Sequence, residues 1–170
     1  MNETQKVKYN VVDDFPTKGV RFIDFTPTLS DPIAFQDMVS ALIIQGDIQN
    51  CDYIISPEAR GFIWGSAVAF QTRKPLLIAR KVGKLPPDLV GVSVSYETEY
   101  SIATLELEEI DLTNKKVVYI DDVYATGGTY DACKQLVSQL GGKVTNGAVL
   151  YNVGINEDET MYAVYEGGDL

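Results

Sequence analysis

Apolar residues recur at intervals of three and four along one early segment of the chain, which is the spacing of an amphipathic helix. Asp31 and Pro32 precede the pattern as a helix N-cap and a proline at the first helical position, and Gly46 follows it. The pattern therefore predicts a helix that begins at Pro32 and stops at Gly46. The apolar positions are Phe35, Met38, Val39, Leu42 and Ile43.

Short apolar runs alternate with helical patterns through the rest of the chain. Segment 61–70 is apolar on nearly all faces and predicts a buried helix, whereas 131–140 carries one apolar helical face. Strands that alternate with helices are typical of an α/β fold with a mainly parallel central sheet flanked by helices. Ligands of such sheets bind beyond the carboxyl ends of the strands. The runs that predict buried strands are 53–55, 76–79, 117–120 and 147–151.

Residues 82–102 show no sustained period and are rich in Gly, Pro, Ser, Tyr and Glu. A loop of this length in a compact domain is usually functional or mobile, so we expect a flexible lid loop here. No repeat or linker divides the sequence. We therefore expect one domain that covers residues 1–170.

Composition and charge narrow the range of functions. With 170 residues, 45% of them hydrophobic and 22% charged, the chain has the balance of one globular domain. A net charge of -10 makes nucleic acid a poor partner, because binding it requires cations that displace counterions from phosphates. No apolar run approaches the roughly 18 residues of a membrane span. We expect a soluble, cytoplasmic protein with no membrane partner.

The sequence contains no histidine, which removes the usual general base and the serine–histidine and cysteine–histidine nucleophiles. Cys51 and Cys133 lack the paired spacing of a zinc site and are predicted to be reduced, buried thiols. Any catalysis must therefore use carboxylates, lysines, tyrosines or backbone groups.

Segment 120–129, with the sequence Ile-Asp-Asp-Val-Tyr-Ala-Thr-Gly-Gly-Thr, leads from a predicted strand into a predicted helix. Gly127 and Gly128 permit close backbone approach, and amides at a helix start favour an anion such as phosphate. The segment fits neither GxxxxGK[ST] nor GxGxxG. Carboxylates repel phosphate, so Asp121 and Asp122 are expected to hold hydroxyls or a metal ion. The segment thus indicates a sugar phosphate, with an ordinary strand-turn-helix joint as the alternative.

This segment resembles the phosphoribosyl pyrophosphate signature of the type I phosphoribosyltransferases. Residues 15–24, 57–65, 80–86 and 95–100 resemble motifs of the adenine branch of that family, in the same order. The resemblance implies the type I phosphoribosyltransferase fold, with an irregular N-terminal hood over residues 1–30 that contributes to base binding, and the lid loop over 82–102.

The resemblance also implies which residues bind phosphoribosyl pyrophosphate. The 5-phosphate would lie on Ala125, Thr126, Gly127, Gly128 and Thr129, and the ribose hydroxyls on Asp121 and Asp122. Mg2+ would accompany the pyrophosphate, and Asp121 and Asp122 are candidate ligands for it. The expected cationic contacts of the pyrophosphate are Arg60, Lys81 and Lys84. Arg60 follows a Glu58–Ala59 bond that the family often keeps cis.

A second set of residues corresponds to the base pocket of the family. Phe22 and Val123 match the two apolar faces that enclose the purine, and Arg21 and Tyr100 are further base-binding candidates. Glu99 aligns with the lid glutamate that hydrogen-bonds the imidazole edge of the base, so it is the expected catalytic residue. The chain departs from the family at Ile23, where arginine is common.

The implied reaction joins N9 of adenine to C1 of the phosphoribosyl group and releases pyrophosphate and AMP, a step of purine salvage. Phosphoribosyltransferases for xanthine, guanine or hypoxanthine are alternatives within the family. A non-catalytic regulator that senses phosphoribosyl pyrophosphate is the alternative from another class. Family members are usually homodimers, and we expect the same here.

Overall fold

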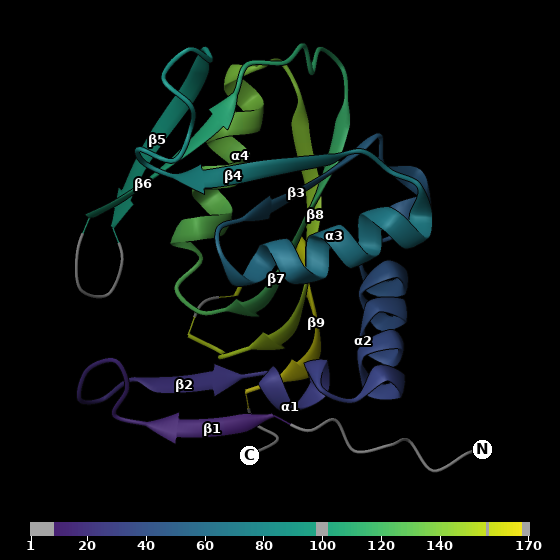
Figure 1. The fold of residues 1–170 in the computed structure, drawn as a ribbon, viewed down its shortest axis with the longest axis vertical. Helices are drawn as coiled ribbons and strands as arrows, with labels where there is room; N and C mark the ends of the chain where they lie inside the picture. Colours follow the sequence, from purple (N-terminus) through teal and green to yellow (C-terminus); the bar gives the residue numbers. More distant parts are fainter. Residues whose placement is uncertain (1–8, 98–101, 156, 168–170) are drawn as a thin grey trace.

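The computed structural model of the chain describes residues 9–97, 102–155 and 157–167. Within these residues, seven strands form the central sheet, in the order β5-β6-β4-β3-β7-β8-β9 (Figure 1). Their bounds are β3 Tyr53–Pro57, β4 Leu76–Lys81, β5 Gly91–Glu97, β6 Ile102–Glu108, β7 Lys116–Tyr124, β8 Lys143–Asn152 and β9 Met161–Glu166. Strand β3 pairs in parallel with β4 and β7, and β8 pairs in parallel with β7 and β9. The antiparallel pairings in this sheet are those of β6 with β4 and with β5, so the predicted mainly parallel sheet is confirmed.

Helices cover both faces of the sheet. Helices α2 (Pro32–Gln45) and α3 (Arg60–Thr72) cover one face, and α4 (Gly128–Gln139) covers the other (Figure 1). The Asp31 carboxylate accepts hydrogen bonds from the first-turn amides of α2, and Gly46 is its C-cap. The predicted helix, with its N-cap and its stop, is therefore confirmed.

The buried positions of β7 divide between the two layers of core, because alternate side chains of a strand point to opposite faces. Val117 and Tyr119 belong to the cluster under α4, whereas Val118 and Ile120 belong to the cluster under α2 and α3. Strand β7 lies inside the sheet between β3 and β8, and its carboxyl end is close to the first turns of α3 and α4.

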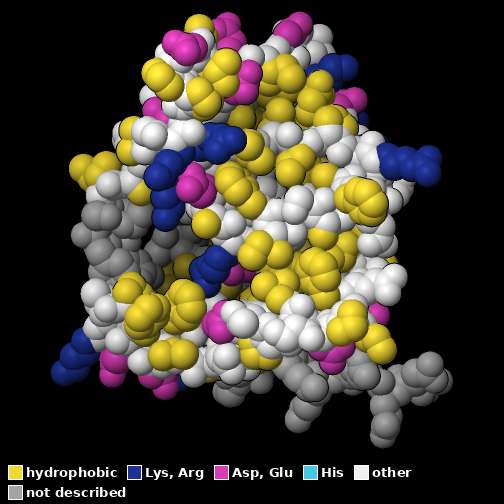
Figure 2. Space-filling model, in the orientation of Figure 1, with side chains coloured by type: hydrophobic (Ala, Val, Ile, Leu, Met, Phe, Trp, Pro, Cys, Tyr) yellow, Lys and Arg dark blue, Asp and Glu magenta, His cyan; other side chains and the backbone are white. Residues whose placement is uncertain are grey.

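Helix α3 is not buried on nearly all faces, and that prediction is wrong. Ile63 and Phe70 are 41% and 90% exposed, and Ile44 of α2 is 78% exposed. Figure 2 shows hydrophobic side chains on this outward surface. A helix that covers one face of a sheet leaves its opposite side to solvent, whatever the residues there.

The assignment of loop to residues 82–102 is wrong for Gly91–Glu97, where β5 pairs with β6 residue by residue, and the role of the segment as a lid stays a prediction. Val92, Val94 and Tyr96 pack toward the core, with exposed serines between them. This period of two is the signal that an assignment of loop overlooked.

Residues 9–30, the described part of the predicted hood, are more regular than expected. Strands β1 (Asn10–Asp13) and β2 (Arg21–Asp24) form an antiparallel hairpin, and α1 (Thr26–Leu29) follows. Figure 1 shows this hairpin beyond the carboxyl ends of the central strands. Strand β9 was also missed by the sequence patterns.

Cys51 and Cys133 are free and buried, as expected. None of the helices in the described parts of the chain is both long and apolar enough to cross a membrane.

Candidate active site

Two adjoining cavities lie at the carboxyl ends of β3, β4 and β7. The first encloses about 420 Å³ and the second about 350 Å³. Acidic and basic residues line the first, whereas Phe22, Val153 and Ile155 give the second its apolar wall. The residues that line both cavities are Arg60, Tyr96, Val123, Ala125, Thr126 and Thr129.

The turn from β7 into α4 contributes lining residues to both cavities. Gly127 adopts a left-handed φ of 85°, which glycine allows without strain, and α4 begins at Gly128. The first-turn amides of α4 and its dipole make this turn suited to an anion. Thr129 donates a hydrogen bond from Oγ1 to the Tyr96 hydroxyl at 3.3 Å, which ties the helix start to β5.

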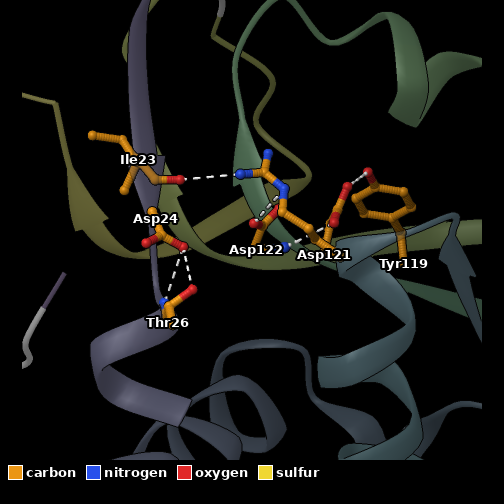
Figure 3. Close-up of polar contacts among 7 residues, drawn as sticks. Ile23, Asp24, Thr26, Tyr119, Asp121 and Asp122 are labelled. Carbon is orange, nitrogen blue, oxygen red and sulfur yellow. Dashed lines mark hydrogen bonds and ion pairs between the residues drawn. The ribbon is translucent and has the colours of Figure 1, made fainter. Parts of the chain in front are cut away.

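Arg60 joins three parts of the site. Its Nε lies 3.0 Å from Oδ2 of Asp122 at the end of β7, and its Nη1 donates to the Ile23 carbonyl at 3.1 Å (Figure 3). The guanidinium carbon also lies 4.7 Å from the centre of the Phe22 ring, a cation–π distance. Burial raises the pKa of Asp122, and the charge of Arg60 acts in the opposite direction.

Asp121 has a different environment from its neighbour. The Tyr119 hydroxyl donates to Oδ2 at 2.7 Å, and the Asp122 amide donates to Oδ1 at 2.9 Å. Burial, followed by the charge of Asp122, raises the pKa of Asp121 well above its usual value. Burial and the Asp121 charge likewise raise the pKa of Tyr119, so the phenol keeps its proton and is the donor.

The cationic residues expected from the sequence separate in the structure. Arg60 and Lys81 line the first cavity, whereas Lys84 is not among the residues that line either cavity. The Lys81 amide donates to Oε2 of Glu58 at 2.9 Å, which ties the end of β4 to the segment before α3. The Glu58–Ala59 peptide bond is cis, the form that the family often has.

Phe22 and Val123 both line the second cavity, and Arg21 lines it as well. The Arg21 guanidinium is engaged with Asp13 of the hairpin, with Nε 2.9 Å from the carboxylate. Ile23 is only 2% exposed and packs in the core, and its carbonyl accepts the Arg60 bond. Glu99 and Tyr100 lie outside the described residues.

Sequence patterns missed several residues that line these cavities. Tyr96 lines both cavities, Tyr119 lines the first, and Val153 and Ile155 line the second. The alternation of β5 could have indicated Tyr96. The position of Tyr119 two residues before Asp121, on the same face of a strand, could have indicated the contact between them.

The sheet carries an anion-binding turn at the carboxyl end of β7, with a carboxylate pair beside the turn and an apolar pocket next to it. This combination is typical of proteins that bind phosphorylated sugars. A family model described as "Phosphoribosyl transferase domain" matches residues 36–168. The chain belongs to this phosphoribosyltransferase family, and it has the type I fold of that family.

Relatives of known name agree on the branch of the family. The adenine phosphoribosyltransferase of Corynebacterium diphtheriae is 45% identical over 86% of this chain and 79% of its own length. The crystal structure of the enzyme of that name from Thermoanaerobacter pseudethanolicus has a TM-score of 0.86, with 33% identity over 93% of this chain and 95% of the other. The APRTase of Giardia lamblia complexed with 9-deazaadenine has a TM-score of 0.83, with 29% identity over 93% of each chain.

Proposed function

We propose that the chain transfers the 5-phosphoribosyl group of phosphoribosyl pyrophosphate to N9 of adenine, giving AMP and pyrophosphate in purine salvage. The observation that carries this proposal is the pair of adjoining cavities, which share Ala125, Thr126 and Thr129 of the turn from β7 into α4. One cavity offers charged groups to a diphosphate and a sugar, and the other offers an apolar wall to a flat base. The names of the relatives support adenine as that base.

In this proposal the 5-phosphate binds the turn from Ala125 to Thr129, where the amides at the start of α4 stabilise its charge. Asp121 and Asp122 accept hydrogen bonds from the ribose hydroxyls. Phe22 and Val123 contact the two faces of the purine, and Arg21 and Tyr100 complete the base-binding set. The second cavity contains the described members of that set.

The pyrophosphate would lie against Arg60 and Lys81 in the first cavity. Among the described residues, the acidic lining of that cavity consists of Glu58, Asp121 and Asp122, and its basic lining of Arg60 and Lys81. This acid excess calls for a cation that enters with the diphosphate. Mg2+ fits because it prefers oxygen ligands and binds phosphates with few protein ligands, for which Asp121 and Asp122 are candidates. When bound, it would neutralise the charge that develops on the departing pyrophosphate.

Transfer requires no protein nucleophile if the ribose passes through a state that resembles an oxocarbenium ion. The residues must then stabilise the leaving anion, hold the base near C1 and exclude water. Arg60 serves the first task directly and supports the second, because its guanidinium contacts the Phe22 ring on the base side. Its bond to the Ile23 carbonyl fixes the β1–β2 hairpin to the same position.

We propose Glu99 as the residue that hydrogen-bonds the imidazole edge of the purine during transfer. Glu99→Gln is expected to lower kcat about 100-fold, because the amide cannot act as the same charged acceptor. The matched control is Glu108→Gln, which removes an exposed carboxylate from β6 and is expected to leave kcat unchanged. Steady-state turnover measures both variants. An unchanged kcat in Glu99→Gln would remove Glu99 from the mechanism.

The experiment that tests the proposed function measures pyrophosphate release from phosphoribosyl pyrophosphate and Mg2+ with each purine in turn. Adenine is expected to give the highest kcat/KM, by about 100-fold or more over the 6-oxopurines, because the donor and acceptor pattern at C6 is reversed between them. Turnover with hypoxanthine, guanine or xanthine in preference to adenine would contradict the choice of base. No turnover with any base would contradict the enzyme and favour a non-catalytic sensor of phosphoribosyl pyrophosphate.

The homodimer, the cytoplasmic location, the single domain over residues 1–170 and the contribution of Lys84 stay predictions from the sequence.

A further inference from the structure

Tyr119 is a buried polar residue to which the proposed mechanism gives no role. It lies in the middle of β7 and is 2% exposed. Its ring packs edge to face against Tyr130 of α4, with 5.1 Å between the ring centres. Its hydroxyl is directed at Oδ2 of Asp121, as Figure 3 shows. Tyr119 therefore connects the core under α4 to a carboxylate that lines the first cavity.

The Asp121 carboxylate is held at both of its oxygens. Tyr119 donates to Oδ2 at 2.7 Å, and the Asp122 amide donates to Oδ1 at 2.9 Å. Gly61, in the first turn of α3, approaches so closely that a Cβ there would be 2.9 Å from Oδ1. Two donors and a tight backbone contact thus restrict the rotation of this carboxyl group. A carboxylate oxygen can accept more than one hydrogen bond, so each oxygen keeps acceptor capacity for a ligand in the cavity.

Packing alone does not account for the hydroxyl at this position. A phenylalanine would fill the same volume and make the same ring contact with Tyr130, without a polar group to bury. The Tyr130 hydroxyl itself bonds Thr160, at 2.9 Å, so the aromatic cluster does not depend on the bond to Asp121. The structural consequence of the Tyr119 hydroxyl is therefore its hydrogen bond to the Asp121 carboxylate.

We propose that Tyr119 is a positioning residue for sugar binding, whose hydroxyl holds the Asp121 carboxylate in the orientation that accepts a ribose hydroxyl. This inference rests on the proposed function, because it takes the ligand of Asp121 to be the ribose of phosphoribosyl pyrophosphate. Although Tyr119 borders the first cavity, it is only 2% exposed and its hydroxyl is already donated to Asp121, so in this proposal it acts through Asp121 rather than by contact with the sugar. Pre-oriented acceptors bind more tightly because their rotational freedom is lost before the ligand arrives.

Calorimetric binding of two ligands separates positioning from general damage. Ribose 5-phosphate has both the phosphate and the hydroxyls, whereas inorganic phosphate has only the anion for which the turn 125–129 is suited. Tyr119→Phe is expected to weaken the binding of ribose 5-phosphate about tenfold, because the Asp121 carboxylate must then be ordered when the sugar binds, and to change the binding of inorganic phosphate less than about twofold. Equal weakening of both ligands, or of neither, would overturn the proposal.

A double-mutant cycle with Asp121→Asn tests the route of the effect. If Tyr119 acts through the Asp121 carboxylate, adding Tyr119→Phe to the Asp121→Asn variant should lower the affinity for ribose 5-phosphate less than about twofold. A tenfold effect that persists there would overturn the proposal. Tyr165→Phe is the control, because it removes a half-buried hydroxyl 3.9 Å from the Met38 sulfur in the other core cluster. It should leave both affinities unchanged.

Steady-state kinetics adds a second test, because a purely structural role would not change KM for one substrate and leave KM for the other unchanged. In Tyr119→Phe, KM for phosphoribosyl pyrophosphate should rise about tenfold, with KM for adenine unchanged, because only the sugar contact is altered. A wild-type protein without turnover would contradict the proposed function, and the calorimetric cycle would still decide the role of Tyr119. Turnover by the wild type with an unchanged KM in Tyr119→Phe would contradict only the role of Tyr119.

Discussion

Arg60→Ala is expected to lower kcat/KM for phosphoribosyl pyrophosphate about 100-fold or more, which corresponds to about 2.7 kcal/mol of transition-state stabilisation. The substitution removes the cation that the pyrophosphate would meet in the first cavity, and one lost donor to a developing anion has effects of this size. It also leaves Asp122, whose side chain is 5% exposed, without its ion-pair partner. An unpaired buried carboxylate adds repulsion against the incoming diphosphate.

Arg60→Lys separates the charge of Arg60 from its geometry. The lysine ammonium can reach Asp122, but it cannot also span to the Ile23 carbonyl as the guanidinium does through Nε and Nη1. We therefore expect an intermediate loss of about tenfold, with a rise in KM for adenine because the β1–β2 hairpin loses its anchor.

Arg73→Asn is the control for this pair of variants. Arg73 is an exposed residue at the other end of the same helix, with a left-handed φ of 58° that asparagine tolerates. Steady-state kinetics over both substrates, with thermal unfolding to confirm folding, measures all three variants. Activity of Arg60→Ala within about threefold of wild type would place the pyrophosphate elsewhere.

The elements that could be predicted from the sequence are those with one buried face and clear ends. Helix α2 shows both a periodic apolar face and an N-cap, and the start of α4 is marked by the two glycines of the anion-binding turn. The carboxyl end of β7 could be located because a buried strand must precede that turn. These signals are local, so they do not depend on knowing which elements pack together.

Other elements have no local signal of this kind. Every residue of β1 is exposed, and in β2 only Ile23 is fully buried, so these two strands of four residues are too short to show a clear apolar alternation. Strand β9 lies at the edge of the sheet and has no fully buried position. Its place is fixed by parallel pairing with β8, a contact between distant segments.

The site, like the fold, has features that the sequence could predict and features that depend on how the elements pack. The paired aspartates could be found from their place beside the anion-binding turn, but their separate partners could not. Asp122 is paired with Arg60 of α3, and Asp121 with Tyr119, because adjacent residues of a strand point to opposite faces. Which helix covers each face is a property of the assembled sheet. The separation of Lys81 from Lys84 likewise depends on how the chain turns after β4.

Gly128→Ala is expected to lower the affinity for inorganic phosphate and for phosphoribosyl pyrophosphate about 100-fold. It is also expected to lower the free energy of unfolding by about 1–3 kcal/mol. A Cβ at this position would lie 2.9 Å from the Glu97 carbonyl oxygen and 3.0 Å from Cδ2 of Tyr96. The first of these atoms belongs to the backbone of a paired strand, so relief requires β5 or the start of α4 to move. Either movement disturbs the amides on which the phosphate would bind.

The direction of this effect opposes intrinsic helix propensity, which makes it a sharp test. Alanine favours a helix over glycine by about 1 kcal/mol, so a position free of close contacts would be stabilised by the substitution. Gln135→Ala, on an exposed face of the same helix, is the matched control and should leave phosphate affinity unchanged. Thermal unfolding and phosphate calorimetry measure both variants. A Gly128→Ala protein that is more stable and binds phosphate normally would show that β5 does not press on the anion-binding turn, and Tyr96 would then lose its place in the site.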